Sequence, residues 1–281
     1  MDLAPCQVSN GAPVTPIFKL DRLARIVQDI FYQFRKKTFG AGIKKIEYRD
    51  GIMFTHETVA KDFLSIAELL GLCASYNDEK TLLVRYGCTE AVALMGDMLM
   101  YGLGLDESSQ PENNSEGESS FAEMNCHVVV STVEVKEPDR KFVRITAVGE
   151  RDRDPPLHEF FKVTFLVDGV KQSYALDLSC AQYGYYNPLV AYNDYLKDRV
   201  AVLKLAQTLG RVKQKYNRYS KSPLLERANF WAKEILSNIW QWEIQEGIRL
   251  MDVIGLPEGE YEEKRLKLLN RVAECLEPRR A

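Results

Sequence analysis

Residues 158–184, HEFFKVTFLVDGVKQSYALDLSCAQYG, contain the clearest signal for a β-hairpin in the chain. Two strand-like runs flank Asp168-Gly169, and a DG pair in this setting is the strongest short-range signal for a β-hairpin. A two-residue loop makes Val167 the partner of Val170 and sets the register of every pair that precedes them. The sequence therefore predicts two antiparallel strands in one defined register.

This register predicts where the polar residues at the open end of the hairpin lie. Phe160 falls opposite Asp177, and His158 falls opposite Ser179. Side chains alternate between the two faces of a strand, so all four share one face. His158 and Asp177 are then diagonal neighbours, about 7–8 Å apart at Cα. A hydrogen bond between them would fix the imidazole tautomer, stabilise the imidazolium and leave the second ring nitrogen for a nucleophile.

The order of segments predicts an α+β fold, with an antiparallel sheet after N-terminal helices and before a helical C-terminal extension. We expect the sheet to be a meander of four consecutive strands. These are residues 126–135, 141–149, 158–167 and 170–179. Before them, the sequence predicts an amphipathic helix from Leu20, a hairpin around Asp50-Gly51 and a helical run within residues 60–74. From about Tyr192 onward we expect only helices.

The composition divides the chain into three parts that we expect to form one compact unit. Residues 1–16 read as a flexible leader, residues 17–192 as the α+β core, and residues 193–281 as the helical extension packed on it. Residues 105–120 are polar and acidic, which predicts a mobile solvated loop within the core.

Composition and cysteine spacing also restrict the class of protein. The 281 residues are 46% hydrophobic and 27% charged, with a net charge of −3, so the whole molecule has no bias toward polyanions. No apolar run is long enough to span a membrane, and the N-terminus lacks the features of a signal peptide. Six scattered cysteines without a CxxC pair argue against a metal site or a disulfide framework. We therefore expect a cytoplasmic protein without a metal or another cofactor.

Cys88 is the best candidate for the nucleophile. Residues 81–104, TLLVRYGCTEAVALMGDMLMYGLG, predict an extended approach, a tight turn at Gly87 and a helix from about Cys88 to Met100. The N–H groups and dipole at a helix N-terminus favour a thiolate, and the Cys88 N–H can donate to an oxyanion. The other cysteines fall in the leader, late in helices or beside strands (Cys6, Cys73, Cys126, Cys180 and Cys275).

A cysteine at the start of an apolar helix, a histidine on a strand and an aspartate on the next strand resemble the transglutaminase-like thiol enzymes. Arylamine N-acetyltransferases and, more distantly, papain-like peptidases are relatives of that superfamily. The resemblance covers about residues 80–185 and implies a transglutaminase/papain-like core. It implies Cys88 as nucleophile, His158 as base and Asp177 as the group that orients the base. Thr89 stands where the family usually has an aromatic residue beside the cysteine.

Each of these three residues also has a structural interpretation. Cys88 can be a small buried core residue, His158 a strand-end histidine that faces water, and Asp177 the cap of a turn. His127 is a rival base because it also begins a strand, although no aspartate follows it at hairpin distance. His56 falls in a predicted loop, with a structural or an exposed role.

Two further groups of residues are candidates for binding. Gln182, Tyr183 and Tyr185 follow Asp177 in a loop that would contact substrate, or whose tyrosines would instead cover the core. Residues 197–227 hold nine Lys or Arg against two acids. The densest cluster is Arg211, Lys213, Lys215, Arg218 and Lys221. It would meet an anionic partner, such as RNA or an acyl carrier, or form an ordinary solvated surface.

These observations together predict a cysteine-dependent acyltransferase that forms an amide through a thioester on Cys88. The acyl group would come from a small molecule or a peptide, or from an anionic carrier such as a carrier protein, coenzyme A or tRNA. One alternative is a thiol amidohydrolase or peptidase of the same fold. The other is a non-catalytic interaction protein that binds through its basic C-terminal region.

Overall fold

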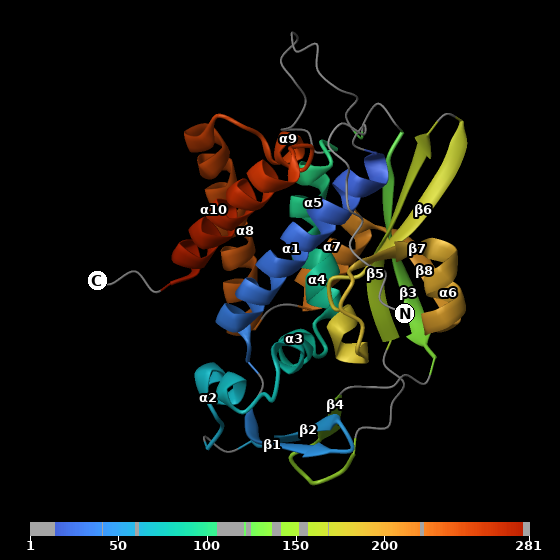
Figure 1. Ribbon diagram of the computed structural model, residues 1–281. Helices are drawn as coiled ribbons and strands as arrows, with labels where there is room; N and C mark the ends of the chain where they lie inside the picture. Colours follow the sequence, from blue (N-terminus) through green and yellow to red (C-terminus); the bar gives the residue numbers. More distant parts are fainter. Residues whose placement is uncertain are drawn as a thin grey trace.

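The computed structural model describes residues 15–40, 42–59, 62–105, 121, 125–136, 142–151, 157–167, 169–219 and 222–277. Almost all of the predicted leader and of the acidic loop 105–120, as well as Asp168 and Lys221, lie outside these residues. Within the described chain, helices and two sheets form an α+β fold, as predicted. Figure 1 shows helices α1, α8 and α10 together on one side, the larger sheet on the other, and the smaller sheet at one end.

The helices and strands have the following bounds. The helices are α1 (Pro16–Thr38), α2 (Ile66–Gly71), α3 (Tyr76–Val84), α4 (Cys88–Leu94), α5 (Gly96–Gly102), α6 (Tyr192–Arg199), α7 (Leu209–Tyr219), α8 (Pro223–Glu246), α9 (Leu250–Val253) and α10 (Glu258–Leu276), with a 3₁₀ turn η2 (Cys180–Tyr183). The strands are β1 (Ile43–Arg49), β2 (Ile52–Glu57), β3 (His127–Val135), β4 (Phe142–Ile145), β5 (Leu157–Val167), β6 (Val170–Leu176), β7 (Leu189–Ala191) and β8 (Val200–Thr208).

The larger sheet confirms the predicted hairpin. Its strand order is β7-β6-β5-β3-β8, and every neighbouring pair is antiparallel. Strands β5 and β6 pair from Val167 with Val170 to Phe161 with Leu176, which is the register that a two-residue loop requires. Gly169 has a φ of 75°, a left-handed conformation that glycine adopts without strain.

The predicted four-strand meander is wrong at its second strand. Strand β4 does not lie between β3 and β5, because it pairs in parallel with β2 in a separate three-stranded sheet of order β1-β2-β4. Phe142 and Val143 are both buried, so β4 has no alternating pattern, and Phe142 joins a separate apolar cluster with Ile43 and Met53. The predicted hairpin at Asp50-Gly51 is present, as the antiparallel strands β1 and β2 of this sheet.

The prediction of helices alone after Tyr192 is also wrong, because β8 is the edge strand beside β3. Most of its residues are exposed, including Val202, Leu203 and Leu205. A strand with little burial on either face needs no alternation of apolar and polar residues, which is the signal that identifies strands in a sequence. Its pairing with β3 depends on backbone groups that a sequence pattern does not reveal.

Two local predictions before the sheet also need correction. The segment that approaches Gly87 is helical, as α3, because Ser75 caps it by accepting a hydrogen bond from Asp78 N. The helix expected from Cys88 to Met100 is interrupted at Met95, which separates α4 from α5. A Cβ atom on Gly96 would lie 2.5 Å from Leu209 Cδ1, so the start of α5 packs closely against α7.

One apolar core joins the N-terminal helices, the larger sheet and the C-terminal helices. Its fully buried members include Phe31 of α1, Phe161 of β5, Ile239 of α8 and Leu268 of α10. Helix α1 begins with Thr15 as its N-cap and Pro16 in its first turn, and α8 and α10 pack along it. None of the described helices is long and apolar enough to cross a membrane.

Candidate active site

Three elements meet where β5 begins. Strand β5 supplies His158, the segment after β6 supplies Asp177, and the N-terminus of α4 supplies Cys88. Helix α4 packs against β5, while η2 packs against α3 (Figure 1). The antiparallel register of β5 and β6 places the histidine near the aspartate, and the packing of α4 adds the cysteine.

The predicted hydrogen bond between His158 and Asp177 is present. His158 Nε2 lies 2.8 Å from Asp177 Oδ2, and both side chains are buried. The imidazole stacks over Phe160 with a ring-centroid separation of 6.3 Å, as expected for two residues on one face of the strand. Nε2 is therefore directed at the carboxylate, and Nδ1 is left for other partners.

Two further groups hold the Asp177 carboxylate. The backbone N–H of Ser179 donates to Oδ1 at 3.0 Å, and the Tyr195 hydroxyl donates to Oδ2 at 2.8 Å. Burial alone would raise the pKa of Asp177, but the charge and hydrogen bond of His158 and the bond from Tyr195 outweigh it and lower that pKa. Tyr195 lies on α6, and no sequence pattern linked it to the site.

The same contacts keep a proton on His158. Burial lowers the pKa of the imidazole, but the Asp177 charge and hydrogen bond, together with contacts from Cys88, outweigh burial and raise the pKa to about 10. A protonated histidine beside a buried carboxylate forms an ion pair in the protein interior.

Cys88 lies close enough to the imidazole to help raise the pKa of His158. Its thiol donates to the Leu157 carbonyl oxygen at 3.8 Å. Gly87 precedes it in a confined space, since a Cβ atom there would lie 3.1 Å from the Val84 carbonyl oxygen and 3.4 Å from Phe31. The turn that brings Cys88 to His158 therefore leaves little room for a side chain before the cysteine.

The other described cysteines have different surroundings. Burial raises the pKa of Cys73 to about 11 and that of Cys126 to about 12, and it raises the pKa of Cys180 still further. Cys275 is partly buried beside Asn238, and Cys6 lies outside the described residues. High thiol pKa values make Cys73, Cys126 and Cys180 poor nucleophiles near neutral pH.

Gln182 and Tyr183 contact the catalytic candidates directly, whereas Tyr185 does not contact His158. The Gln182 Oε1 atom accepts a hydrogen bond from Tyr86 N at 3.2 Å, and its Nε2 lies 3.4 Å from His158 Nδ1. The Tyr183 ring meets the imidazole edge-on, with centroids 4.9 Å apart. The Tyr185 ring instead lies under the Arg199 guanidinium, whose Cζ atom is 3.7 Å from the centroid of the tyrosine ring.

The two other histidines lie elsewhere. His127 is exposed at the start of β3 and pairs with Thr164, whereas His158 pairs with Val133 six residues further along β3. His56 lies on β2, with Nε2 3.4 Å from a carboxylate oxygen of Glu47. The structure therefore places the rival base His127, and also His56, away from His158.

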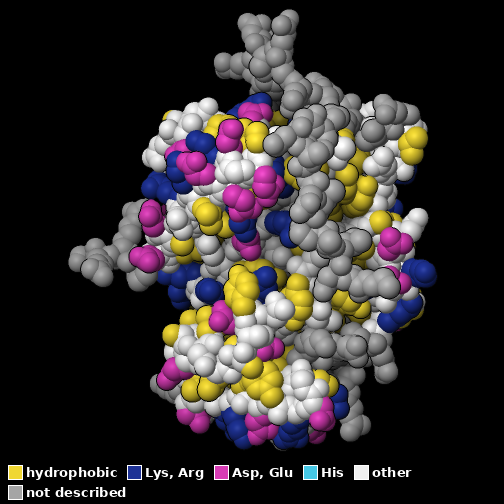
Figure 2. Space-filling view, in the orientation of Figure 1, with side chains coloured by type: hydrophobic (Ala, Val, Ile, Leu, Met, Phe, Trp, Pro, Cys, Tyr) yellow, Lys and Arg dark blue, Asp and Glu magenta, His cyan; other side chains and the backbone are white. Residues whose placement is uncertain are grey.

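The basic cluster occupies the outer face of α7. Arg211, Lys215 and Arg218 are exposed, while Val212 and Tyr216 on the same helix are buried in the core. Figure 2 shows acidic and basic side chains interspersed on the face that it displays. The basic side chains are thus available to solvent, and nothing in the structure assigns them a ligand.

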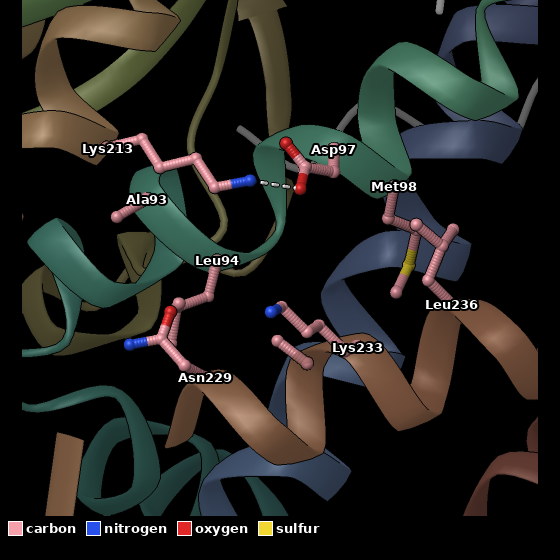
Figure 3. Close-up of a pocket in the computed structure, with 9 residues that line it drawn as sticks. Ala93, Leu94, Asp97, Met98, Lys213, Asn229, Lys233 and Leu236 are labelled. Carbon is pink, nitrogen blue, oxygen red and sulfur yellow. Dashed lines mark hydrogen bonds and ion pairs between the residues drawn. The ribbon is translucent and has the colours of Figure 1, made fainter. Parts of the chain in front are cut away.

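Lys213, the other member of the cluster that the structure describes, forms an ion pair with Asp97 at the edge of a small cavity between α4, α5, α7 and α8 (Figure 3). The cavity measures about 40 Å³ and is lined mostly by apolar side chains, with Lys233 and Asn229 from α8 beside them. Cys88, His158 and Asp177 do not line it. It is therefore separate from the group around His158.

Comparison with other proteins gives no match, so the function has to be inferred from the geometry of the site. No protein-family model matches the chain, and neither a curated protein nor a solved structure is significantly similar to it. In the part of the chain that the structure describes, no three His, Cys, Asp or Glu side chains are grouped to hold a metal ion.

Proposed function

We propose that the chain is a cysteine-dependent acyltransferase with a core of the transglutaminase-like type. In this proposal Cys88 is the nucleophile, His158 the general base and acid, and Asp177 the group that orients His158. One observation carries it: the buried imidazole is bonded to Asp177 through Nε2, and the nearby Cys88 side chain helps to raise its pKa. A nucleophile, a base and an orienting carboxylate in contact are the signature of nucleophilic catalysis by a thiol.

The proposed reaction has two balanced steps. In the first, the Cys88 thiolate beside the protonated His158 attacks the acyl carbon of the donor. The S–C bond forms, the bond to the leaving group breaks, and His158 gives its proton to that group. In the second, an amine attacks the thioester and loses its proton to His158. An amide forms, and Cys88 leaves with the bonding electrons as a thiolate beside the protonated His158.

The contacts of Gln182 support a role in substrate binding. Its carbonyl oxygen is occupied by the Tyr86 N–H, so its NH₂ group faces His158 Nδ1. When His158 is protonated, Nδ1 does not accept a hydrogen bond, and the amide then needs another acceptor. The oxygen of the tetrahedral intermediate is such an acceptor, and a bond made only at that stage favours the transition state.

The chemistry of the acyl donor remains part of the proposal. A thioester on Cys88 is well suited to attack by an amine, and the exposed basic face of α7 suits an anionic carrier such as coenzyme A, a carrier protein or tRNA. The free thiol that this reaction needs fits a reducing, cytoplasmic setting. Water in place of the amine would make the same site a hydrolase.

Iodoacetamide labelling near pH 7, followed by peptide mass spectrometry, tests the nucleophile. We expect Cys88 to be alkylated at least tenfold faster than Cys126 and Cys180, although all three are buried. His158→Ala should remove this preference, and the exposed His127→Ala should keep it. Equal and slow labelling of all the cysteines would exclude a thiol enzyme and leave an interaction protein.

Acyl transfer itself is tested with a thioester and two acceptors. We expect Cys88 to take the acyl group from an S-acyl N-acetylcysteamine, seen as a mass increase of the intact protein that Cys88→Ala abolishes. Added hydroxylamine should collect the acyl group as a hydroxamate faster than water releases the free acid. Release into water alone would assign hydrolysis instead of transfer.

A further inference from the structure

The turn between α3 and α4, which ends at Cys88, has an unfavourable local conformation. Tyr86, two residues before the cysteine, has a φ of 51°, a left-handed conformation that bulky residues rarely adopt. Backbone strain of this kind persists only where the surrounding structure enforces it. Gly87, at the N-cap position of α4, has no side chain with which to cap the helix. Contacts from other elements therefore have to fix this turn.

Helix α1 supplies such contacts through Arg35, whose side chain is buried. Its Nε atom donates to the Leu83 carbonyl oxygen at 2.7 Å, and its Nη2 atom donates to the Arg85 carbonyl oxygen at 3.5 Å. Both carbonyls belong to the C-terminal end of α3, where the last carbonyls have no partner within the helix. The guanidinium of Arg35 thus holds the residues that lead into the turn.

The same guanidinium also holds the start of α4. Its Nη1 atom forms an ion pair with Glu90, which lies in the first turn of α4 two residues after Cys88. A Cβ atom on Gly87 would lie 3.5 Å from Arg35 Nε and 3.4 Å from Phe31 Cζ, so this face of α1 lies directly against the turn. One buried side chain therefore connects the residues before Cys88 with those after it.

We propose that Arg35 is a positioning residue, which places the Cys88 sulfur for its reaction beside His158. The inference rests on the proposed thiol chemistry at Cys88. A planar guanidinium presents several donors in fixed directions, so one arginine can bind two carbonyls and a carboxylate at the same time. A displacement of a reacting group by about 1 Å can slow a reaction about 100-fold, so a strained turn that carries the nucleophile has to be held firmly.

The test is a double-mutant cycle with His158, read from the rate at which iodoacetamide alkylates Cys88 near pH 7. We expect Arg35→Gln to slow this alkylation about tenfold, because the sulfur is then displaced from the imidazole that promotes its reaction. In the His158→Ala protein, Arg35→Gln should cause no further decrease, since the partner of the cysteine is already absent. The labelling rates of Cys126 and Cys180 in the same samples should not change, which shows that the protein has not opened.

Arg22, on the same helix, provides a matched control. It is 4% exposed, donates to the carbonyl oxygens of Ile254 and Leu256, and forms an ion pair with Glu258. Arg22→Gln therefore removes the same kinds of contact from α1, about 20 Å along the helix from Arg35. This variant should alkylate at Cys88 as fast as the wild-type protein. Far-UV circular dichroism of both variants establishes that they are folded.

Thioester acylation provides a second measurement. With S-acetyl N-acetylcysteamine as the donor, Arg35→Gln should lower the limiting rate of Cys88 acylation and leave the half-saturating donor concentration unchanged. The reason is that Arg35 is buried against the turn and acts on the nucleophile instead of on the donor. A higher half-saturating concentration with an unchanged limiting rate would assign Arg35 to donor binding and overturn the proposal.

The possible outcomes distinguish this proposal from the proposed function. Selective labelling of Cys88 that Arg35→Gln does not slow overturns the role of Arg35 and leaves the triad. A decrease of the same size in Arg22→Gln, or an equal further decrease in the His158→Ala protein, also overturns that role, because Arg35 would then only stabilise the fold. Equal and slow labelling of all the cysteines in the wild-type protein overturns the triad, and the role of Arg35 with it.

Discussion

At the scale of single residues, the hydrogen bonds of Asp177 determine how His158 is held. Tyr195→Phe deletes one bond to a buried carboxylate and leaves the ring in place. We expect the free energy of unfolding to fall by roughly 1.5–3 kcal/mol, as for a hydrogen bond to a charged group. The pH profile of Cys88 alkylation should shift as well, because the bond from Tyr195 helps to lower the pKa of Asp177.

The measurements for this prediction are urea unfolding and iodoacetamide kinetics between pH 5 and pH 9. Tyr174→Phe is the control, since its hydroxyl bonds to Gln172 on β6 instead of to the triad. A shift of the alkylation profile in both variants, or in neither, would show that Tyr195 does not act through Asp177.

The ion pair also predicts a dependence of stability on pH. The pKa of His158 is raised from its ordinary 6.5 to about 10, so the folded protein holds this proton more tightly than the unfolded chain. The stabilisation is therefore complete below about pH 6.5 and is lost as the pH rises through about 10. The pKa of Asp177 is lowered, so its contribution is present above the ordinary value of 3.8 and is lost as the pH falls through the lower folded value.

We expect the free energy of unfolding to decrease from pH 7 to pH 10 more steeply in the wild-type protein than in His158→Gln. Chemical denaturation at a series of pH values measures it. His127→Gln removes an exposed imidazole and should follow the wild-type curve. Parallel curves for the wild-type protein and His158→Gln would mean that His158 does not retain its proton in the folded state.

At the scale of the elements, helix α5 can pack closely against α1 because Gly102 has no side chain. A Cβ atom on Gly102 would lie 2.5 Å from Leu23 Cδ1, and Leu23 is fully buried. Gly102→Ala should therefore lower the free energy of unfolding by about 1–3 kcal/mol, the usual cost of overpacking a core. Gly259→Ala, in the first turn of α10 with no atom within 4 Å of its Cβ, should raise stability by up to about 1 kcal/mol.

Urea unfolding of both alanine variants measures these opposite effects. Their difference in sign is the informative result, because glycine to alanine in a helix is favourable unless space is lacking. Stabilisation by both substitutions would show that α5 and α1 do not approach as closely as the structure indicates.

At the scale of the whole molecule, a single core predicts cooperative unfolding. All three tryptophans, Trp231, Trp240 and Trp242, lie on α8, so fluorescence reports on the C-terminal helices. Cys180 is completely buried beyond the end of β6, so its reaction with a thiol reagent reports on the sheet. We expect both signals and far-UV circular dichroism to change at the same urea concentration. Separate midpoints would show that α8 to α10 unfold independently of the sheet.

The sequence predicted the parts of the fold that rest on local signals. The DG pair predicted the register of β5 and β6, and through it the contact between His158 and Asp177. Strand β4 was predicted as a strand but in the wrong sheet, because nothing in its own residues indicates that it pairs with β2. Strand β8 escaped prediction because it is largely exposed. The contacts of Tyr195 and Tyr86 escaped it for a different reason: their partners are distant in the chain, and no spacing rule connects them.

The identity of the reactive side chains and the pairing of the central hairpin follow from the amino-acid sequence. Turn chemistry and side-chain alternation act over a few residues, so the chain order contains them. Three other features depend on tertiary packing. Helix α4 lies with Cys88 near His158, and α6 and η2 contribute Tyr195 and Gln182. Strand β4 belongs to the smaller sheet, where Phe142 packs against Tyr86. These contacts depend on how helices and sheets pack around a shared core, where many residues act at once and no short pattern specifies the outcome.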